Sequence, residues 1–125
     1  MWSVMVRDMS DEAKGRLLVS HRLGGGAGSA SEGIGALDAV PDGLRWSIKK
    51  LLGRGQCGLV AWGDIDGWEF SRASGGRDLY GVVVSWAGGQ AMLLNSGPEA
   101  VRRYSLLTEQ AMKFIPAERF TVSLD

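Results

Sequence analysis

The stretch His21–Gly33, HRLGGGAGSASEG, has the glycine content of a loop that binds phosphate. Such a loop needs glycines because its backbone N–H groups must come close to the phosphate oxygens. A P-loop also needs a lysine and a hydroxyl residue directly after its last glycine, but Ile34 and Gly35 follow here. The dinucleotide fingerprint fails as well, because a serine stands at its third glycine position. The stretch therefore predicts a flexible surface loop at about residues 24–35 and no phosphate site.

A glycine-rich loop of this kind can also close over a bound small molecule. In this alternative the ligand is nucleotide-like, the side chains of His21 and Arg22 supply polar contacts, and Gly26 and Gly28 let the backbone approach it. His21 is the only histidine, which excludes a metal site or a nuclease mechanism built on two histidines of one chain. A nucleophile pair of Cys57 and His21 is an alternative to a small buried cysteine at the start of a strand, which we favour.

A second group of chemically active side chains surrounds the sequence GDIDG. Asp64 and Asp66 could begin a calcium loop, but Gly75 stands at position twelve of that loop, where glutamate is required. Asp66-Gly67 is instead a signal for a β-hairpin turn, with a tryptophan on either side. If the tryptophans are exposed, the hairpin offers an acidic and aromatic surface to a partner protein. This predicted partner surface consists of Trp62, Asp64, Asp66, Trp68 and Glu69.

A third candidate surface combines Trp46 with Lys49 and Lys50. On a helix, these side chains lie off the apolar face and form a basic, aromatic surface, which could stack a nucleobase or engage an acidic partner. The 14 basic and 14 acidic residues of the chain cancel, however, and a nucleic-acid-binding protein is usually basic. A protein partner is therefore favoured. Binding of nucleic acid through Trp46, Lys49 and Lys50 stays an alternative.

Length and composition indicate a folded protein of one domain, residues 1–125. A single cysteine, Cys57, excludes an internal disulfide, as in proteins of a reducing compartment. Charges at Arg7, Asp8 and Asp11 interrupt any apolar signal-peptide core. The longest uncharged run, Leu79–Pro98, contains glycines that suit a hairpin better than a membrane span. We expect a cytoplasmic protein with no membrane contact.

The patterns along the chain predict an α+β domain. Its main part is an antiparallel sheet of about five or six strands, with two amphipathic helices packed on one face. The apolar spacing predicts a helix from Asp42 to Leu52 and a second one after a capping box of Ser96 and Glu99, ended by Pro116. The expected strands are WSVMVRD, CGLVAW, WEFSR, LYGVVVSWA, QAMLLN and ERFTVSLD, where Gly88-Gly89 joins the fourth and fifth. The segment at residues 10–23 is either a helix capped by Ser10 or a turn followed by a further strand, RLLVSHRL, and we favour the strand.

No set of side chains in the sequence converges on a catalytic arrangement, so we expect neither an enzyme nor a bound cofactor or metal. The favoured function is a small binding module that occupies the surface of another protein, as inhibitors, immunity proteins and counter-defence proteins do. One alternative is a small-molecule binding protein in which the glycine-rich loop is a flap. A second alternative is a structural protein that forms homo-oligomers through strands near its termini, at exposed edges of the sheet.

Overall fold

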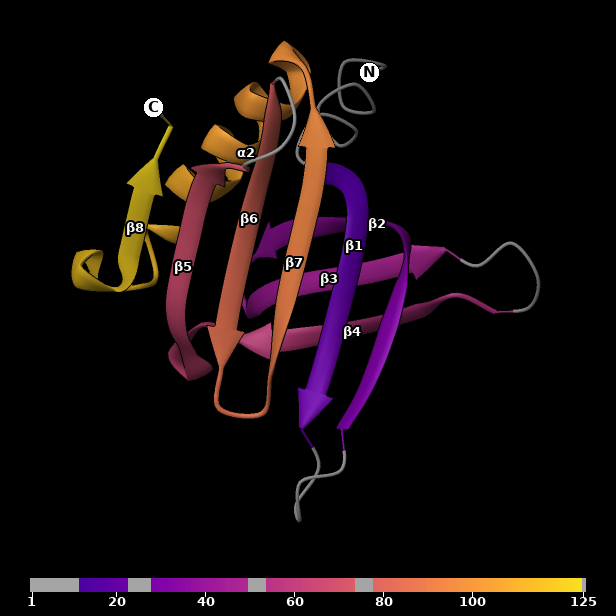
Figure 1. Cartoon of the computed structure of the whole chain (residues 1–125). Helices are drawn as coiled ribbons and strands as arrows, with labels where there is room; N and C mark the ends of the chain where they lie inside the picture. Colours follow the sequence, from indigo (N-terminus) through magenta and orange to yellow (C-terminus); the bar gives the residue numbers. More distant parts are fainter. Residues whose placement is uncertain (1–11, 23–27, 50–53, 74–77, 125) are drawn as a thin grey trace, which may run out of the picture.

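The computed structural model describes residues 12–22, 28–49, 54–73 and 78–124. These residues form one sheet with one α-helix and two single turns of 3-10 helix (Figure 1). The strands are β1 (Ala13–Arg22), β2 (Gly28–Val40), β3 (Gly43–Lys49), β4 (Gln56–Ala61), β5 (Ile65–Arg72), β6 (Leu79–Trp86), β7 (Gly89–Ser96) and β8 (Phe120–Ser123). The helical segments are η1 (Trp62–Asp64), α2 (Pro98–Ala111) and η2 (Ala117–Arg119).

The strands follow the order β4-β3-β2-β1-β7-β6-β5-β8 across the sheet. All neighbouring strands are antiparallel except β5 and β8, which are parallel. A parallel pairing needs a long connection, and α2 supplies it, because the chain runs from β7 through the helix to the far side of β5. The last strand, β8, lies at one edge of the sheet, as the sequence suggested, and β4 lies at the other.

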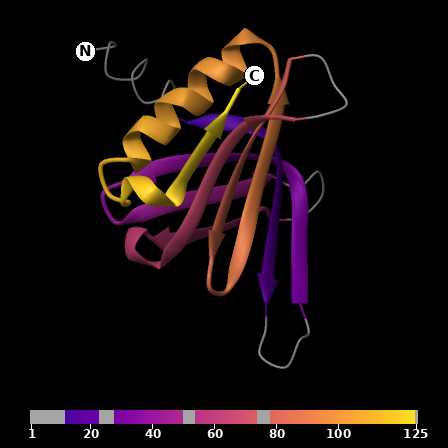
Figure 2. The ribbon, with the colours of Figure 1, turned by 60° about the vertical axis from the view of Figure 1, so that its left-hand side comes forward.

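The sheet curls into a half-barrel. In Figure 1, β3 and β4 run across β5, β6 and β7 at a steep angle, and β2 bends between the two groups. Figure 2 shows α2 lying over the concave side at one end of the half-barrel, where it contacts strands β1, β2, β5, β6 and β7. The predicted architecture of five or six strands and two helices is therefore wrong. The described residues hold eight strands and one α-helix.

The predicted helix at 42–52 is strand β3 in its described part. Leu44, Trp46 and Ile48 are buried, while Arg45 and Lys49 are exposed and Ser47 is half-buried. This alternation has a period of two, which is that of a strand with one buried face. The helical interpretation failed because Leu44 and Ile48 are also four residues apart, a spacing that both structures share.

The predicted loop at 24–35 is also wrong from residue 28 onward, because β2 begins at Gly28. The inward face of this strand carries small residues, since Ser29, Ser31 and Gly35 lie opposite inward-facing residues of β1. A Cβ on Gly35 would lie 2.4 Å from the backbone oxygen of Ser47, so only glycine allows β2 and β3 to come this close. Small residues thus form the bend between the two layers of the half-barrel.

Of the two predicted hairpins, one forms and the other does not. Strands β6 and β7 do form a hairpin, but Trp86 lies opposite Gly89, so its turn is Ala87-Gly88 and not Gly88-Gly89. The register differs from the predicted one by two residues, which leaves each side chain on its predicted face. The hairpin at Asp66-Gly67 is wrong: β4 and β5 are not neighbours, and the register shift between Ile65 and Gly67 marks a β-bulge.

The core fills the space between the two strand layers and α2. Its buried apolar residues include Leu17, Val19, Leu37, Leu44, Ile48, Ile65, Phe70, Val82, Val84, Leu93, Tyr104, Leu107 and Ile115. Helix α2 begins at Pro98 after Gly97, whose φ of 95° suits glycine, and no side chain caps it. The predicted capping box is therefore wrong. Glu99 instead accepts hydrogen bonds from Arg102 and Arg103, and the bond from Arg102 lowers the pKa of this carboxyl.

The strand expected at 2–8 lies outside the described residues. Among the described helices, none has the length and apolar character needed to cross a membrane.

Candidate functional site

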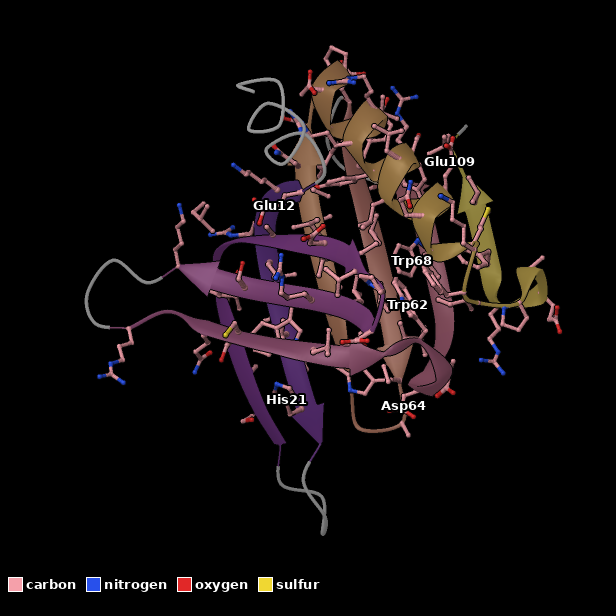
Figure 3. All side chains as sticks on the ribbon, turned by 180° about the vertical axis from the view of Figure 1, so that it is seen from behind. Glu12, His21, Trp62, Asp64, Trp68 and Glu109 are labelled. Carbon is pink, nitrogen blue, oxygen red and sulfur yellow. The ribbon has the colours of Figure 1, made fainter. Side chains whose placement is uncertain are left out.

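A groove opens on the concave face of the sheet, at the end away from α2. It has a volume of about 720 Å³, and no residue of α2 lines it. A neighbouring hollow of about 540 Å³ shares His21, Ser29 and Trp86 with it. Figure 3 shows His21 on β1 beside β4, far from the helix. Residues that line the groove include His21, Ser29, Ser31, Trp46, Gln56, Gly58 and Trp86.

The register of four neighbouring strands builds one wall of the groove. His21 of β1 lies opposite Ser29 of β2 and opposite Gly89 of β7, and Gly89 in turn lies opposite Trp86 of β6. Directly opposed residues point to the same face of a sheet. Ser29, His21 and Trp86 therefore form one row across the concave face, with a glycine in the gap between His21 and Trp86.

The other wall comes from β3 and β4. Trp46 of β3 lies directly opposite Gly58 of β4, and its indole lies against that glycine. A Cβ on Gly58 would stand 2.6 Å from Nε1 of Trp46. Trp86 is placed in the same way, because a Cβ on Gly89 would stand 3.1 Å from its Cζ2. Each tryptophan thus lies over a glycine of the next strand, and the glycine sets the position of the ring.

The four described tryptophans differ in where their N–H groups donate. Nε1 of Trp62 donates to the carbonyl oxygen of Val40 at 2.9 Å, and Nε1 of Trp68 donates to Oγ1 of Thr108 at 3.0 Å. Trp46 is only 7% exposed, yet its N–H has no acceptor within the described residues. Every fully buried side-chain nitrogen or oxygen in this part of the chain is paired. Nε1 of Trp46 must therefore reach solvent, and Trp46 lines the groove.

The remaining polar groups of the groove also have no hydrogen-bond partner in the described part of the chain. They are the imidazole of His21, the hydroxyls of Ser29 and Ser31, and the amide of Gln56. The ring centroid of His21 lies 5.8 Å from that of Trp46, with the planes tilted by 47°. The described lining carries no lysine, arginine, aspartate or glutamate. Such a groove can form hydrogen bonds and ring contacts, but it holds no permanently charged side chain to pair with an ion.

The nucleophile pair of Cys57 and His21 does not form. Cys57 is exposed, so the favoured interpretation of a buried cysteine is also wrong. Because Gly58 faces Trp46 on the concave side, the neighbouring side chain of Cys57 points to the convex side. His21 lies on the concave side, and the sheet separates the two side chains.

The predicted partner surface is divided by the fold. Trp62 and Trp68 are buried between the strand layers and α2 (Figure 3), so they offer no aromatic surface to a partner. Asp64, Asp66 and Glu69 are exposed. An exposed aromatic ring does lie nearby: Phe114 is 45% exposed and stacks on Trp62, with ring centroids 4.8 Å apart.

The basic surface of Trp46, Lys49 and Lys50 does not form as predicted. Trp46 and Lys49 are three residues apart on a strand, so they point to opposite faces. Lys50 lies outside the described residues. The predicted surface depended on the predicted helix, because only a helix would bring Trp46 and Lys49 to the same side.

The residues predicted for a small ligand are partly brought to the groove. His21 lines both hollows, and Gly28 lines the smaller one. Arg22 ends β1, and Gly26 lies outside the described residues. Sequence reasoning missed Trp86, Gln56, Ser29 and Ser31. A signal for Trp86 was present, because Gly88 and Gly89 follow it in a predicted hairpin and leave room for a large ring.

Among the described residues, no three histidine, cysteine, aspartate or glutamate side chains come together as a metal site would require. Comparisons of the chain with protein-family models, with curated proteins and with solved structures found no match.

Proposed function

We propose that the chain is a binding protein that holds a small uncharged molecule in its groove. One observation carries this proposal: Trp46 is only 7% exposed, yet its Nε1 reaches solvent and has no acceptor in the described residues. Tryptophan N–H groups in protected positions usually have a partner. A bound molecule with an acceptor atom would supply one.

The other features of the groove support the same function. His21, Gln56, Ser29 and Ser31 add donors and acceptors, while Trp86 adds an aromatic surface. Sites for small molecules commonly combine an apolar, aromatic lining with a few polar groups that fix the ligand's orientation. The groove lacks charged side chains in its described lining, which favours an uncharged ligand because burying an unpaired ion is costly. A cytoplasmic location, where the exposed thiol of Cys57 stays reduced, belongs to this proposal.

A ligand panel tests the proposal through the midpoint temperature of unfolding. A ligand that binds only the folded state raises that temperature with its concentration. The panel contains uncharged heteroaromatic compounds, uncharged saccharides, and phosphorylated forms of both. We expect at least one uncharged compound to raise the midpoint and its phosphorylated form to raise it less. No shift with any compound would contradict the proposal.

A second candidate function is the occupation of a basic site on a partner protein. It is supported by the exposed carboxylates of Asp64, Asp66 and Glu69, which have no ion pair in the described residues, and by exposed Phe114 beside Trp62. Acidic surfaces of this kind steer association with basic partners, as an inhibitor or immunity protein would need.

Affinity capture from host extract tests this second function. The wild-type chain should retain a stoichiometric protein partner, and a triple variant, Asp64→Asn, Asp66→Asn and Glu69→Gln, should lose it while unfolding at the same temperature. Equal capture by both chains would contradict the role of these carboxylates.

A further inference from the structure

We infer that the groove takes a neutral, planar heteroaromatic compound, whose ring nitrogen or carbonyl oxygen accepts a hydrogen bond from Nε1 of Trp46 while its ring lies against Trp86. This inference rests on the proposed function and narrows it to one chemical class of ligand. Three features of the groove carry it: a fixed donor, a flat aromatic surface and an uncharged lining.

The fixed donor is the indole N–H of Trp46. Gly58 lies against Nε1, Cε2 and Cζ2 of this ring, and the rest of the side chain belongs to the core. The indole N–H donates and cannot accept. A matching ligand must therefore present an acceptor at the groove wall, and ring nitrogens and carbonyl oxygens of heteroaromatic compounds are acceptors without an attached proton.

The flat surface is the indole of Trp86. One side of this ring lies over Gly89, and its six-membered part would be in contact with any Cβ there. Trp86 is half-buried and lines both hollows, so part of it is accessible from the groove. Planar rings stack on such aromatic surfaces without regard to their exact substituents. The imidazole of His21, which shares the row with Trp86, lies within the same groove.

The uncharged lining separates this class from two others. A phosphorylated or carboxylated ligand would bring a negative charge to a groove whose described lining contains no lysine or arginine. A saccharide has no aromatic ring to lie against Trp86, and the described lining holds no carboxylate to bind its hydroxyl groups in place of that contact. Gln56, His21 and the two serines can satisfy only a few such groups. A neutral heteroaromatic ring demands fewer acceptors and gains more from Trp86.

Indole N–H resonances in a nitrogen–proton correlation spectrum test the inference directly. The probes are adenosine and riboflavin as neutral heteroaromatic compounds, adenosine monophosphate as a charged counterpart, and maltose as a saccharide. Variants Trp46→Phe and Trp86→Phe assign the two groove signals. We expect adenosine or riboflavin to move the Trp46 signal downfield, because a hydrogen bond deshields the proton. The signals of Trp62 and Trp68 are internal controls, since their N–H groups already donate within the protein.

A single glycine substitution tests the role of the indole position. Gly58→Ala places a methyl group against Trp46 and should weaken binding of the responding probe by about tenfold. Gly63→Ala is the matched control, because a Cβ there meets nothing within 4 Å, and it should bind like the wild-type chain. If Gly58→Ala does not fold, Trp86→Ala replaces it, and the loss of the stacking surface should weaken binding to a similar extent.

The outcomes separate the inference from the proposed function. If maltose moves the Trp46 signal and neither heteroaromatic probe does, the ligand class is wrong but a small-molecule site remains. Binding of adenosine monophosphate equal to or tighter than that of adenosine would also overturn the class. If no probe moves either groove signal, the inference and the proposed function are both wrong. Unchanged binding by Gly58→Ala would show that Trp46 is not the donor.

Discussion

At the scale of single residues, the hydrogen bond between Trp68 and Thr108 links strand β5 to helix α2. Trp68 is 2% exposed, and its Nε1 donates to Oγ1 of Thr108 at 3.0 Å. Thr108→Val keeps the shape of the side chain and removes the acceptor. We expect it to lower the free energy of unfolding by about 1–3 kcal/mol, because the indole N–H then stays buried without a partner. Urea denaturation of both chains measures this difference.

A double-mutant cycle of Trp68 and Thr108 tests whether the loss of stability arises from their hydrogen bond. In the background of Trp68→Phe, which has no N–H to satisfy, Thr108→Val should cost much less than it does in the wild-type chain. Equal costs in the two backgrounds would mean that the hydrogen bond contributes nothing, and that the loss arises from packing around position 108.

The sequence alone identified two residues of the groove but not their arrangement. His21 and Trp46 were both named as candidates from the sequence, but for different sites: one for a ligand loop, the other for a basic helix face. Their rings lie 5.8 Å apart in one groove. Residue types therefore identified side chains with binding chemistry, while only the pairing of strands β1, β2 and β3 decided which of them meet.

At the scale of elements, strand β3 shows why local patterns can mislead. Leu44 and Ile48 satisfy the spacing of a helix and that of a strand, and Trp46 between them decides the question. If Trp46 is counted as a core residue, buried residues recur at every second position, as in a strand. The sequence interpretation treated Trp46 as a surface residue and so chose a helix. Helix α2 and strands β5, β6 and β7 were recognised at nearly the observed positions, because their periodicity admits one structure. Residues 10–23 fitted a helix as well as a strand in sequence, and the structure has strand β1 there from Ala13.

The contact of α2 with strand β1 leads to a prediction about alkaline pH. Tyr104 of α2 is fully buried, and its phenol donates to the carbonyl oxygen of Lys14 at 3.0 Å. Burial raises the pKa of Tyr104 above its ordinary value of 10.0. Above that pH the unfolded chain loses the phenol proton while the folded chain keeps it, so the unfolded state gains stability. Tyr104 therefore stabilises the fold fully below pH 10, and this contribution falls as the pH rises further.

The variant Tyr104→Phe isolates this effect. Between pH 8 and pH 11, the free energy of unfolding should fall less steeply for the variant than for the wild-type chain, with the two curves separating in slope only above about pH 10. At pH 8 the variant should be less stable by about 1 kcal/mol, since it lacks the hydrogen bond to Lys14. Parallel curves up to pH 11 would show that Tyr104 ionises as readily in the folded chain as in the unfolded one.

At the scale of the whole molecule, the sheet order lay beyond sequence reasoning. Short turns predicted neighbours correctly for β6 and β7, but the β4–β5 connection also looks like a hairpin in sequence. In the fold, η1 and the buried indole of Trp62 carry the chain from one end of the sheet to the other layer. Whether a short connection folds back or crosses depends on the curl of the whole sheet. That curl needs close contact between β2 and β3, which Gly35, far away in sequence, allows.

The charge distribution of the whole molecule predicts how its stability depends on salt. The chain has a formal net charge of +0 at pH 7, and each described ion pair has at least one partner that is more than half exposed. Such pairs contribute little to stability, so raising NaCl from 0.05 to 0.5 M should change the midpoint of unfolding by less than about 3 °C. A larger decrease would mean that ion pairs hold the layers of the half-barrel together.

Binding should depend on salt in a way that reveals which surface is used. A neutral ligand in the uncharged groove meets no long-range field, so its dissociation constant should stay within about twofold over the same NaCl range. A basic partner attracted by Asp64, Asp66 and Glu69 should bind at least about tenfold more weakly at the higher salt concentration, mainly through slower association. Titrations at both salt concentrations, with the groove ligand and with any captured protein, measure the two dependences. A salt-sensitive affinity for a neutral ligand would move the binding site from the groove to the charged surface.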